Sequence, residues 1–183
     1  MNGIQLMIDE HKYIKRMLVV ARKYSYKIVQ GQPVDYDAFY KIIDFVRNYA
    51  DRHHHGKEED FLFNRMIEHQ GPAAEKLVKN GMLVEHDLGR LHMQLLEDAL
   101  QKVKNGEDEA KIDVIANAVS YTDLLNRHID KEDGVVYKFA ENGLDPSIIE
   151  EINAQCETFE KDAEEKQVQK KYIALLEELE ATL

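Results

Sequence analysis

Residues 82–103, MLVEHDLGRLHMQLLEDALQKV, decide the fold, because a stripe of mainly apolar residues recurs along them in steps of four and three. The stripe consists of Met82, His86, Gly89, Met93, Leu96, Leu100 and Val103. Steps of four and three place these residues along one face of an α-helix, while charged residues cover the opposite face. The stretch therefore predicts an amphipathic helix that packs against other helices and carries a His on its buried face.

The other long segments repeat this pattern. Their stripes run through residues 4–18, 43–61 and 115–139, and none alternates as a strand would. Helix-breaking pairs separate the segments at residues 31–33, 71–72, 105–106 and 142–146, since Gly favours a helix end and Pro a first turn. We predict an all-α, antiparallel up-and-down four-helix bundle over residues 1–143. Residues 144–183 should add a C-terminal helical extension, one long helix or two short ones, packed on the bundle.

Composition narrows the classes of function. The 183 residues are 44% hydrophobic, which suits one globular domain that buries a core without disulfides. A net charge of −11 disfavours nucleic acid and anionic membranes as partners. The single Cys156 excludes a disulfide framework and cysteine-based zinc sites. No apolar run reaches the ~18–20 residues of a membrane span, and the first residues lack a signal-peptide core, so we expect a cytoplasmic protein.

Histidines are the feature that the bundle must explain. Each predicted helix carries one of them on its buried stripe: His11, His54, His86 and His128. Glu58 and Glu132 follow two of these histidines by four residues. That spacing puts imidazole and carboxylate one turn apart on the same face, so both can reach one point. Two such pairs on opposite sides of a bundle could hold two metal ions.

Each His-x-x-x-Glu pair taken alone also fits an exposed polar face. The joint placement favours a metal centre, because burying four imidazoles and two carboxylates without partners would cost several kcal/mol or more for each charged group. A ferritin-like di-iron bundle would use Glu-x-x-His pairs instead. None of the eight histidines has a Glu three residues before it, which disfavours that architecture.

Four stretches carry a family resemblance: IDEHKYIKRML, DRHHHGKEEDFLF, MLVEHDLGR and NRHIDKED. In this order, over residues 4–140, the chain resembles the hemerythrin-like proteins with an HHE cation-binding domain. The resemblance implies two non-heme irons (Fe²⁺/Fe³⁺) with a bridging oxo or hydroxo group, although manganese or zinc also suits such donors. It implies bridging carboxylates and terminal imidazoles, which here would be Glu58, Glu132, His11, His54, His86 and His128.

One departure from the oxygen carriers matters. Those proteins have His-x-x-x-His on the third helix, whereas Arg90 stands four residues after His86. His92 lies about 240° around the helix from His86 and cannot replace the ligand. The implied donors fill about ten of the twelve positions of two six-coordinate irons, leaving two open to a ligand. His55 is a candidate for one of them, but it points about 100° away from His54, which requires a helix distortion or a rim position.

Residues near the predicted ligands have less specific predicted roles. We expect His53 and His69 in water or in contacts around the ligands, and Glu59 as an exposed acid. Tyr121 lies on the stripe of the fourth helix, where it either faces the site or fills the core. Each of three glycines near the ligands marks a tolerated surface position or room for a ligand or a close helix: Gly56, Gly89 and Gly134.

The predicted function is binding or sensing of a small ligand (oxygen, peroxide or nitric oxide) at the iron pair. One alternative is a di-iron oxidoreductase that reduces oxygen or peroxide, or acts on nitric oxide, in stress defence. A second alternative is an iron-responsive interaction module that presents the acidic C-terminal helices to a protein partner. The first two differ in whether the ligand is released unchanged or consumed.

Overall fold

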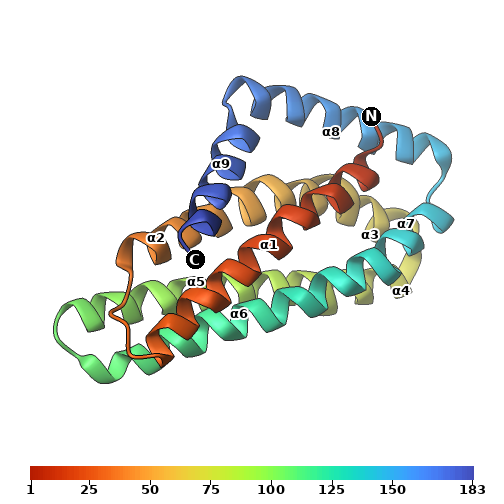
Figure 1. The fold of residues 1–183 in the computed structure, drawn as a ribbon. Helices are drawn as coiled ribbons and strands as arrows, with labels where there is room; N and C mark the ends of the chain where they lie inside the picture. The colour runs from red at the N-terminus through yellow and green to blue at the C-terminus, as the bar shows by residue number, and fades with distance from the viewer.

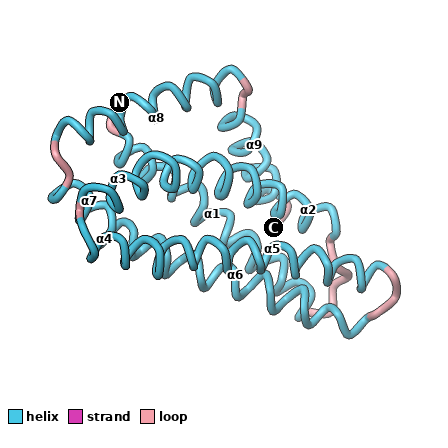
Figure 2. Tube along the Cα trace, turned by 180° about the vertical axis from the view of Figure 1, so that it is seen from behind, coloured by secondary structure: helices cyan, strands magenta, loops and turns pink.

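The computed structural model describes all 183 residues and contains helices and short connections but no strand. Four long arms run antiparallel as a bundle, and two further helices follow the fourth arm (Figure 1). From behind, loops are visible only where one helix gives way to the next (Figure 2). The predicted all-α bundle with an additional C-terminal helical segment is confirmed.

The arms are built from several helical elements each. The first arm is α1 (Gly3–Val29). The second comprises α2 (Tyr36–Phe45), η1 (Val46–His55), η2 (Glu58–Phe63) and α3 (Asn64–His69). The third comprises α4 (Gly71–Leu77), η3 (Val78–Met82) and α5 (Leu83–Lys104). After the 3₁₀ turn η4 (Asp108–Ala110), the fourth comprises α6 (Lys111–Lys131), the π-helical η5 (Glu132–Val136) and α7 (Tyr137–Gly143).

Local sequence sets the first helix boundaries. The Asn2 side chain accepts a hydrogen bond from the Gln5 amide (3.0 Å) and so caps the start of α1. Beyond its end, Gly31 has φ +82°, a left-handed conformation that Gly adopts without strain. Asp35 then accepts from the Ala38 amide (3.0 Å) and caps α2. The chain therefore reverses direction within a few residues.

Three of the four π-helical stretches lie at the predicted ligands. His54 and His55 end η1, Glu58 begins η2, and Glu132 begins η5. A π-helical turn closes one residue later than an α-helical turn, and such turns are frequent at functional sites. They supply the helix distortion that the sequence analysis requires if His54 and His55 are to face one centre.

The C-terminal extension is two helices, α8 (Pro146–Glu165) and α9 (Val168–Ala181), with Gln167 between them in the left-handed conformation at φ 57°. Both helices pack against α1, while α8 also contacts η2 and α9 contacts α2 and η1 (Figure 1). Their apolar faces are buried, as Ile152 of α8 and Leu176 of α9 illustrate. The extension therefore covers one side of the bundle as part of the same core.

The buried apolar side chains form two clusters. The larger includes Leu96, Leu125 and Leu176, and the smaller includes Met7 and Val136. Along each arm, the predicted metal ligands lie between residues of one cluster and residues of the other. The centre of the bundle is therefore a polar layer enclosed by two apolar cores.

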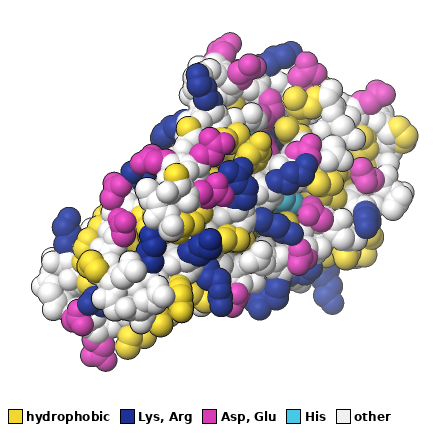
Figure 3. Space-filling model, in the orientation of Figure 1, with side chains coloured by type: hydrophobic (Ala, Val, Ile, Leu, Met, Phe, Trp, Pro, Cys, Tyr) yellow, Lys and Arg dark blue, Asp and Glu magenta, His cyan; other side chains and the backbone are white.

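At the surface, charged and apolar side chains are mixed, and only a small area of His is visible on the face drawn in Figure 3. Most histidines are inside, because all but two have buried side chains. None of the helices has the length and apolar character that a membrane crossing requires.

Candidate metal centre

The structure brings the six predicted ligands together in the polar layer. They come from all four arms, and none is more than 1% exposed: His11, His54, Glu58, His86, His128 and Glu132. The apolar stripes that fold the bundle also place these residues, since each ligand occupies a stripe position. Burial of the imidazoles is therefore a consequence of the same periodicity that forms the core.

The imidazoles lie in two pairs. The Nε2 atoms of His11 and His54 are 2.9 Å apart, and those of His86 and His128 are 3.0 Å apart. Two groups of ligand atoms each lie within 4.8 Å of one another, and Glu58 belongs to both. The first group is His11, His54, Glu58 and Glu132, and the second is His55, Glu58, His86 and His128. Each of these two adjacent groups could hold a cation.

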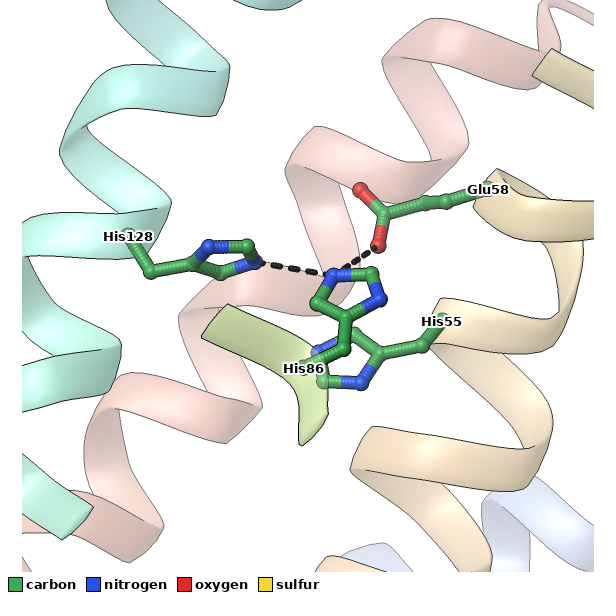
Figure 4. Close-up of side chains that lie close together, drawn as sticks. All are labelled: His55, Glu58, His86 and His128. Carbon is green, nitrogen blue, oxygen red and sulfur yellow. Dashed lines mark hydrogen bonds and ion pairs between the residues drawn. The ribbon is translucent and has the colours of Figure 1, made fainter. Parts of the chain in front are cut away.

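The two carboxylates lie between the pairs. Glu132 Oε2 is 3.4 Å from His11 Nε2, and its Oε1 is 2.9 Å from His128 Nε2. Glu58 Oε2 is 3.7 Å from His54 Nε2 and 3.6 Å from His86 Nε2 (Figure 4). Each carboxylate thus approaches at least one imidazole of each pair, as a bridging ligand would.

Unpartnered oxygens show that the centre fits a metal. Glu58 Oε2 and both carboxylate oxygens of Glu132 are buried and accept no hydrogen bond. Leaving buried carboxyl oxygens without donors is unfavourable, and a bound cation would offset that penalty. The other Glu58 oxygen accepts a hydrogen bond from the Tyr137 hydroxyl, which leaves Oε2 free for the centre.

The outer nitrogens of the imidazoles are bound by a ring of acids. Each Nδ1 donates to a carboxylate of the neighbouring arm: His11 to Asp133 (2.8 Å), His54 to Glu10 (2.8 Å), His86 to Glu59 (2.6 Å) and His128 to Glu85 (2.8 Å). A carboxylate on Nδ1 fixes the orientation of the ring and turns Nε2 inward, toward the centre. The ring therefore holds all four imidazoles ready to bind metal before a metal arrives.

Sequence reasoning missed this ring. The prediction that Glu59 is an exposed acid was wrong, because its half-buried carboxylate accepts from His86. Glu10, Glu85 and Asp133 were not considered at all. A signal was present, since each of the four acids directly precedes or follows a predicted ligand in the sequence. Helix geometry turns that neighbour toward the adjacent arm, where it meets the next ligand's Nδ1.

Three further histidines, His53, His55 and His69, have different environments. His55 is buried and stacks on His86, with ring centres 3.8 Å apart (Figure 4). Its Nδ1 is 3.3 Å from Asp51 Oδ1, so His55 also has an acid beside its Nδ1, although this acid comes from its own arm and lies further away. His53 is buried beside Glu10 rather than in water, and His69 lies at the surface.

A cavity of about 240 Å³ opens beside the second group. His55, His86, Gly89, Arg90 and Tyr121 belong to its lining. The Tyr121 hydroxyl is buried and has no hydrogen-bond partner. A Cβ at Gly89 would lie 3.4 Å from the Tyr121 ring, which is an ordinary van der Waals contact, so the packing here is close but does not require a glycine. The other two glycines near the ligands, Gly56 and Gly134, have nothing within 4 Å and create no such approach.

Charges in the metal-free centre compensate one another. Burial together with the nearby Glu132 raises the pKa of Glu58 to about 8, while His128 and the other facing imidazoles hold that of Glu132 well below its usual range. Burial alone would lower the pKa of His11, but Asp133 and Glu132 raise it to about 9. Protons therefore occupy part of the centre at neutral pH, and a metal must displace them.

Comparison with known families agrees with this geometry. A model described as the hemerythrin HHE cation binding domain matches residues 2–140. The chain belongs to this family, and the predicted resemblance is confirmed. The domain is a cation-binding one, and its His and Glu clusters are able to hold metal. Comparisons with curated proteins and with solved structures gave no match.

Removing one acid of the ring should weaken metal binding without emptying the centre. We expect Asp133→Ala to lower metal affinity about 10–100-fold, because the orientation of His11 would no longer be fixed. Competition with a chelator measures this loss. Asp130→Ala, in the same arm but with a side chain 70% exposed, is the matched control. Equal affinities in the two variants would contradict the role of the ring.

Proposed function

We propose that the protein holds a carboxylate-bridged pair of iron ions and binds or senses oxygen, peroxide or nitric oxide there. The observation that carries this proposal is the inward orientation of the imidazoles, each supported by an acid, around carboxylate oxygens that accept no hydrogen bond. The first ion would be held by His11 and His54, and the second by His86, His128 and His55. Glu58 and Glu132 would serve both.

Iron is the proposed metal because mixed imidazole and carboxylate donors suit it, while manganese and zinc remain alternatives for the same donors. Bound iron would supply a Lewis acid and exchangeable electrons. The chain's own contribution is geometric: the ring of acids orients the imidazoles, and the two apolar clusters limit water on either side.

The cavity beside His55 and His86 supports ligand entry at the second position. Arg90, which stands where the oxygen carriers have another His, lies at this cavity and pairs with Asp51 and Glu59 (2.7 Å each). Access from this side favours a small ligand as the partner. The acidic charge of the chain further favours a small molecule over nucleic acid or an anionic membrane.

The test begins with the reduced protein loaded anaerobically with Fe²⁺, and metal analysis should give two ions per chain. A visible absorption band that appears with oxygen and disappears on degassing would support reversible binding. Steady consumption of peroxide or nitric oxide would instead support the oxidoreductase alternative. A protein that takes up no iron, or whose iron responds to none of the three ligands, would refute the proposal.

The interaction-module alternative gains no support from the structure's surface. Its acidic helices bury their apolar faces against the bundle, with Ile152 and Leu176 both inaccessible. What these helices expose is a mixture of charged side chains of both signs (Figure 3). The two readings that use the cavity therefore have the stronger basis.

The hydroxyl of Tyr121 is available to a ligand in the cavity. We expect Tyr121→Phe to leave iron content unchanged and to weaken ligand binding about 5–10-fold, the value of one hydrogen bond. Stability should not fall, because the hydroxyl has no partner to lose. Tyr24→Phe is the control: it removes a bond to Thr182 (2.7 Å) and should lower stability by about 1 kcal/mol. Thermal unfolding and ligand titration measure both effects, and a destabilised Tyr121→Phe would contradict this reading.

A further inference from the structure

A buried lysine lies behind the metal centre. Lys57, between η1 and η2, has no solvent-exposed surface. Its Nζ donates hydrogen bonds to Glu10 and to Glu160, and lies 3.2 Å from His53 Nε2. An ammonium group is rarely buried unless it is paired. The two carboxylates therefore determine whether Lys57 can stay inside.

Glu10 connects this lysine to a metal ligand. One of its oxygens accepts from Lys57, and the other accepts from His54 Nδ1 at 2.8 Å. Its carboxylate is almost completely buried, so no water competes for these bonds. Because both oxygens are engaged, movement of Lys57 would turn the carboxylate and with it the imidazole of His54.

Glu160 belongs to α8, outside the part of the chain that matches the family. Its second oxygen accepts from Gln169 of α9, so both helices of the extension fix its position. Tight packing holds α8 in place: Asn153 accepts from the Gly3 amide (2.7 Å), and a Cβ at Gly3 would lie 2.8 Å from the Cys156 sulfur. The extension thus presents a carboxylate to Lys57 at a fixed distance from α1.

The other three imidazoles have no such link. Their acids, Glu59, Glu85 and Asp133, are 20–34% exposed and are not tied to a buried cation or to the extension. Only His54 is supported by an acid that is itself enclosed. The two metal positions therefore differ in what lies behind them: the first depends on the extension and the second does not.

We propose that the C-terminal extension positions His54 through the buried chain Glu160–Lys57–Glu10, and so sets how tightly the first metal position holds its ion. Glu160, Lys57 and Glu10 are positioning residues that act through His54. The inference depends on the proposed two-metal centre, but it concerns residues that the family match does not include.

The same cluster is not a third metal site. Glu10, His53 and Glu160 have ligand atoms within 4.8 Å of one another. The Lys57 ammonium, however, bonds to both carboxylates and supplies the positive charge between them. A metal there would have to displace this buried cation.

The test compares Glu160→Ala with Glu164→Ala, an exposed acid one turn further along α8. Zn²⁺ titration against a chelator gives two affinities, and Co²⁺ absorption reports the ligand geometry. We expect Glu160→Ala to weaken one of the two Zn²⁺ affinities about 10–100-fold and alter part of the Co²⁺ spectrum. The other affinity, and both affinities of Glu164→Ala, should match the wild type.

A second variant separates the loss of this positioning contact from a loss of folding. Glu160→Ala leaves Lys57 with a single carboxylate, whereas the double variant Lys57→Met, Glu160→Gln removes both charges and should fold normally by circular dichroism. It should show the same selective loss, because Glu10 is no longer held. Unchanged affinities, or an equal loss at both positions, would overturn the inference. Failure of the wild type to bind two ions would instead refute the proposed function.

Discussion

Glu132→Ala is expected to lose both metal ions rather than one. The carboxylate is completely buried, and its two oxygens approach His11 and His128, which belong to different imidazole pairs. In the proposed two-metal centre, its removal would take a ligand from each position at once. The loss of affinity should exceed the roughly 100-fold that removal of an outer partner causes, so metal analysis after dialysis should find the variant empty.

The same variant should lose the stabilisation that metal gives. Metal at about 100 times its dissociation constant adds ~2.7 kcal/mol to the free energy of unfolding. In a chain of this size that corresponds to a Tm increase of about 5–11 °C. We expect this increase in the wild type and in the Asp130→Ala control, and none in Glu132→Ala. A variant with normal metal content and a normal Tm increase would show that Glu132 does not bridge the two positions.

Periodicity explains why the bundle and the polar layer buried inside it could be predicted. In residues 82–103 the stripe residues Met93, Leu96 and Leu100 are buried in α5, as the steps of four and three indicated. The same steps put His86 on the buried face. A pattern that predicts which face of a helix is buried also predicts which polar residues are buried with it. Only a few polar residues lie on these faces, so they can be identified as candidate ligands from the sequence.

The acids and the lysine that surround the predicted ligands could not be predicted from periodicity, because their positions depend on contacts between arms. Glu85 lies next to His86 in sequence but bonds to His128. Lys57 lies four residues after His53 in a charged stretch and would be expected in solvent, yet the docking of α8 encloses it. The π-helical turns of η1, η2 and η5 also lie at the predicted ligands, and the hydrophobic periodicity gave no sign of them.

Metal-free protein should lose stability between about pH 6.5 and 9, and metal-loaded protein should not. An unfolded His has a pKa of ~6.5. In the folded, metal-free protein burial opposes protonation, but the surrounding carboxylates raise the pKa of His11 and His86 to about 9 and of His128 to about 10. The folded state therefore binds more protons in this range, so its stability falls as the pH rises.

Two other groups help to set the pH range over which the metal-free protein loses stability. Glu58, whose pKa burial and Glu132 raise to about 8, also keeps a proton that the unfolded chain has lost, so it too makes stability fall up to about pH 8. Burial lowers the pKa of His54 to about 4, so this residue favours stability at rising pH only below ~6.5. The metal-free protein should consequently be most stable near pH 6 and less stable at pH 9.

Metal removes this trend, because it binds deprotonated imidazoles and carboxylates and releases their protons, so the folded state no longer carries protons that the unfolded chain has lost. Each proton released contributes about 1.4 kcal/mol to metal binding per pH unit. The Tm difference between Zn²⁺-loaded and chelator-treated protein should therefore widen by several degrees per pH unit from pH 6.5 to 8.5. Proton release, followed with an indicator dye during Zn²⁺ titration near pH 7.5, measures the same linkage independently. If the metal-free protein instead becomes more stable across this range, the buried imidazoles are neutral in the folded state. The raised pKa values of His11, His86 and His128 would then be wrong.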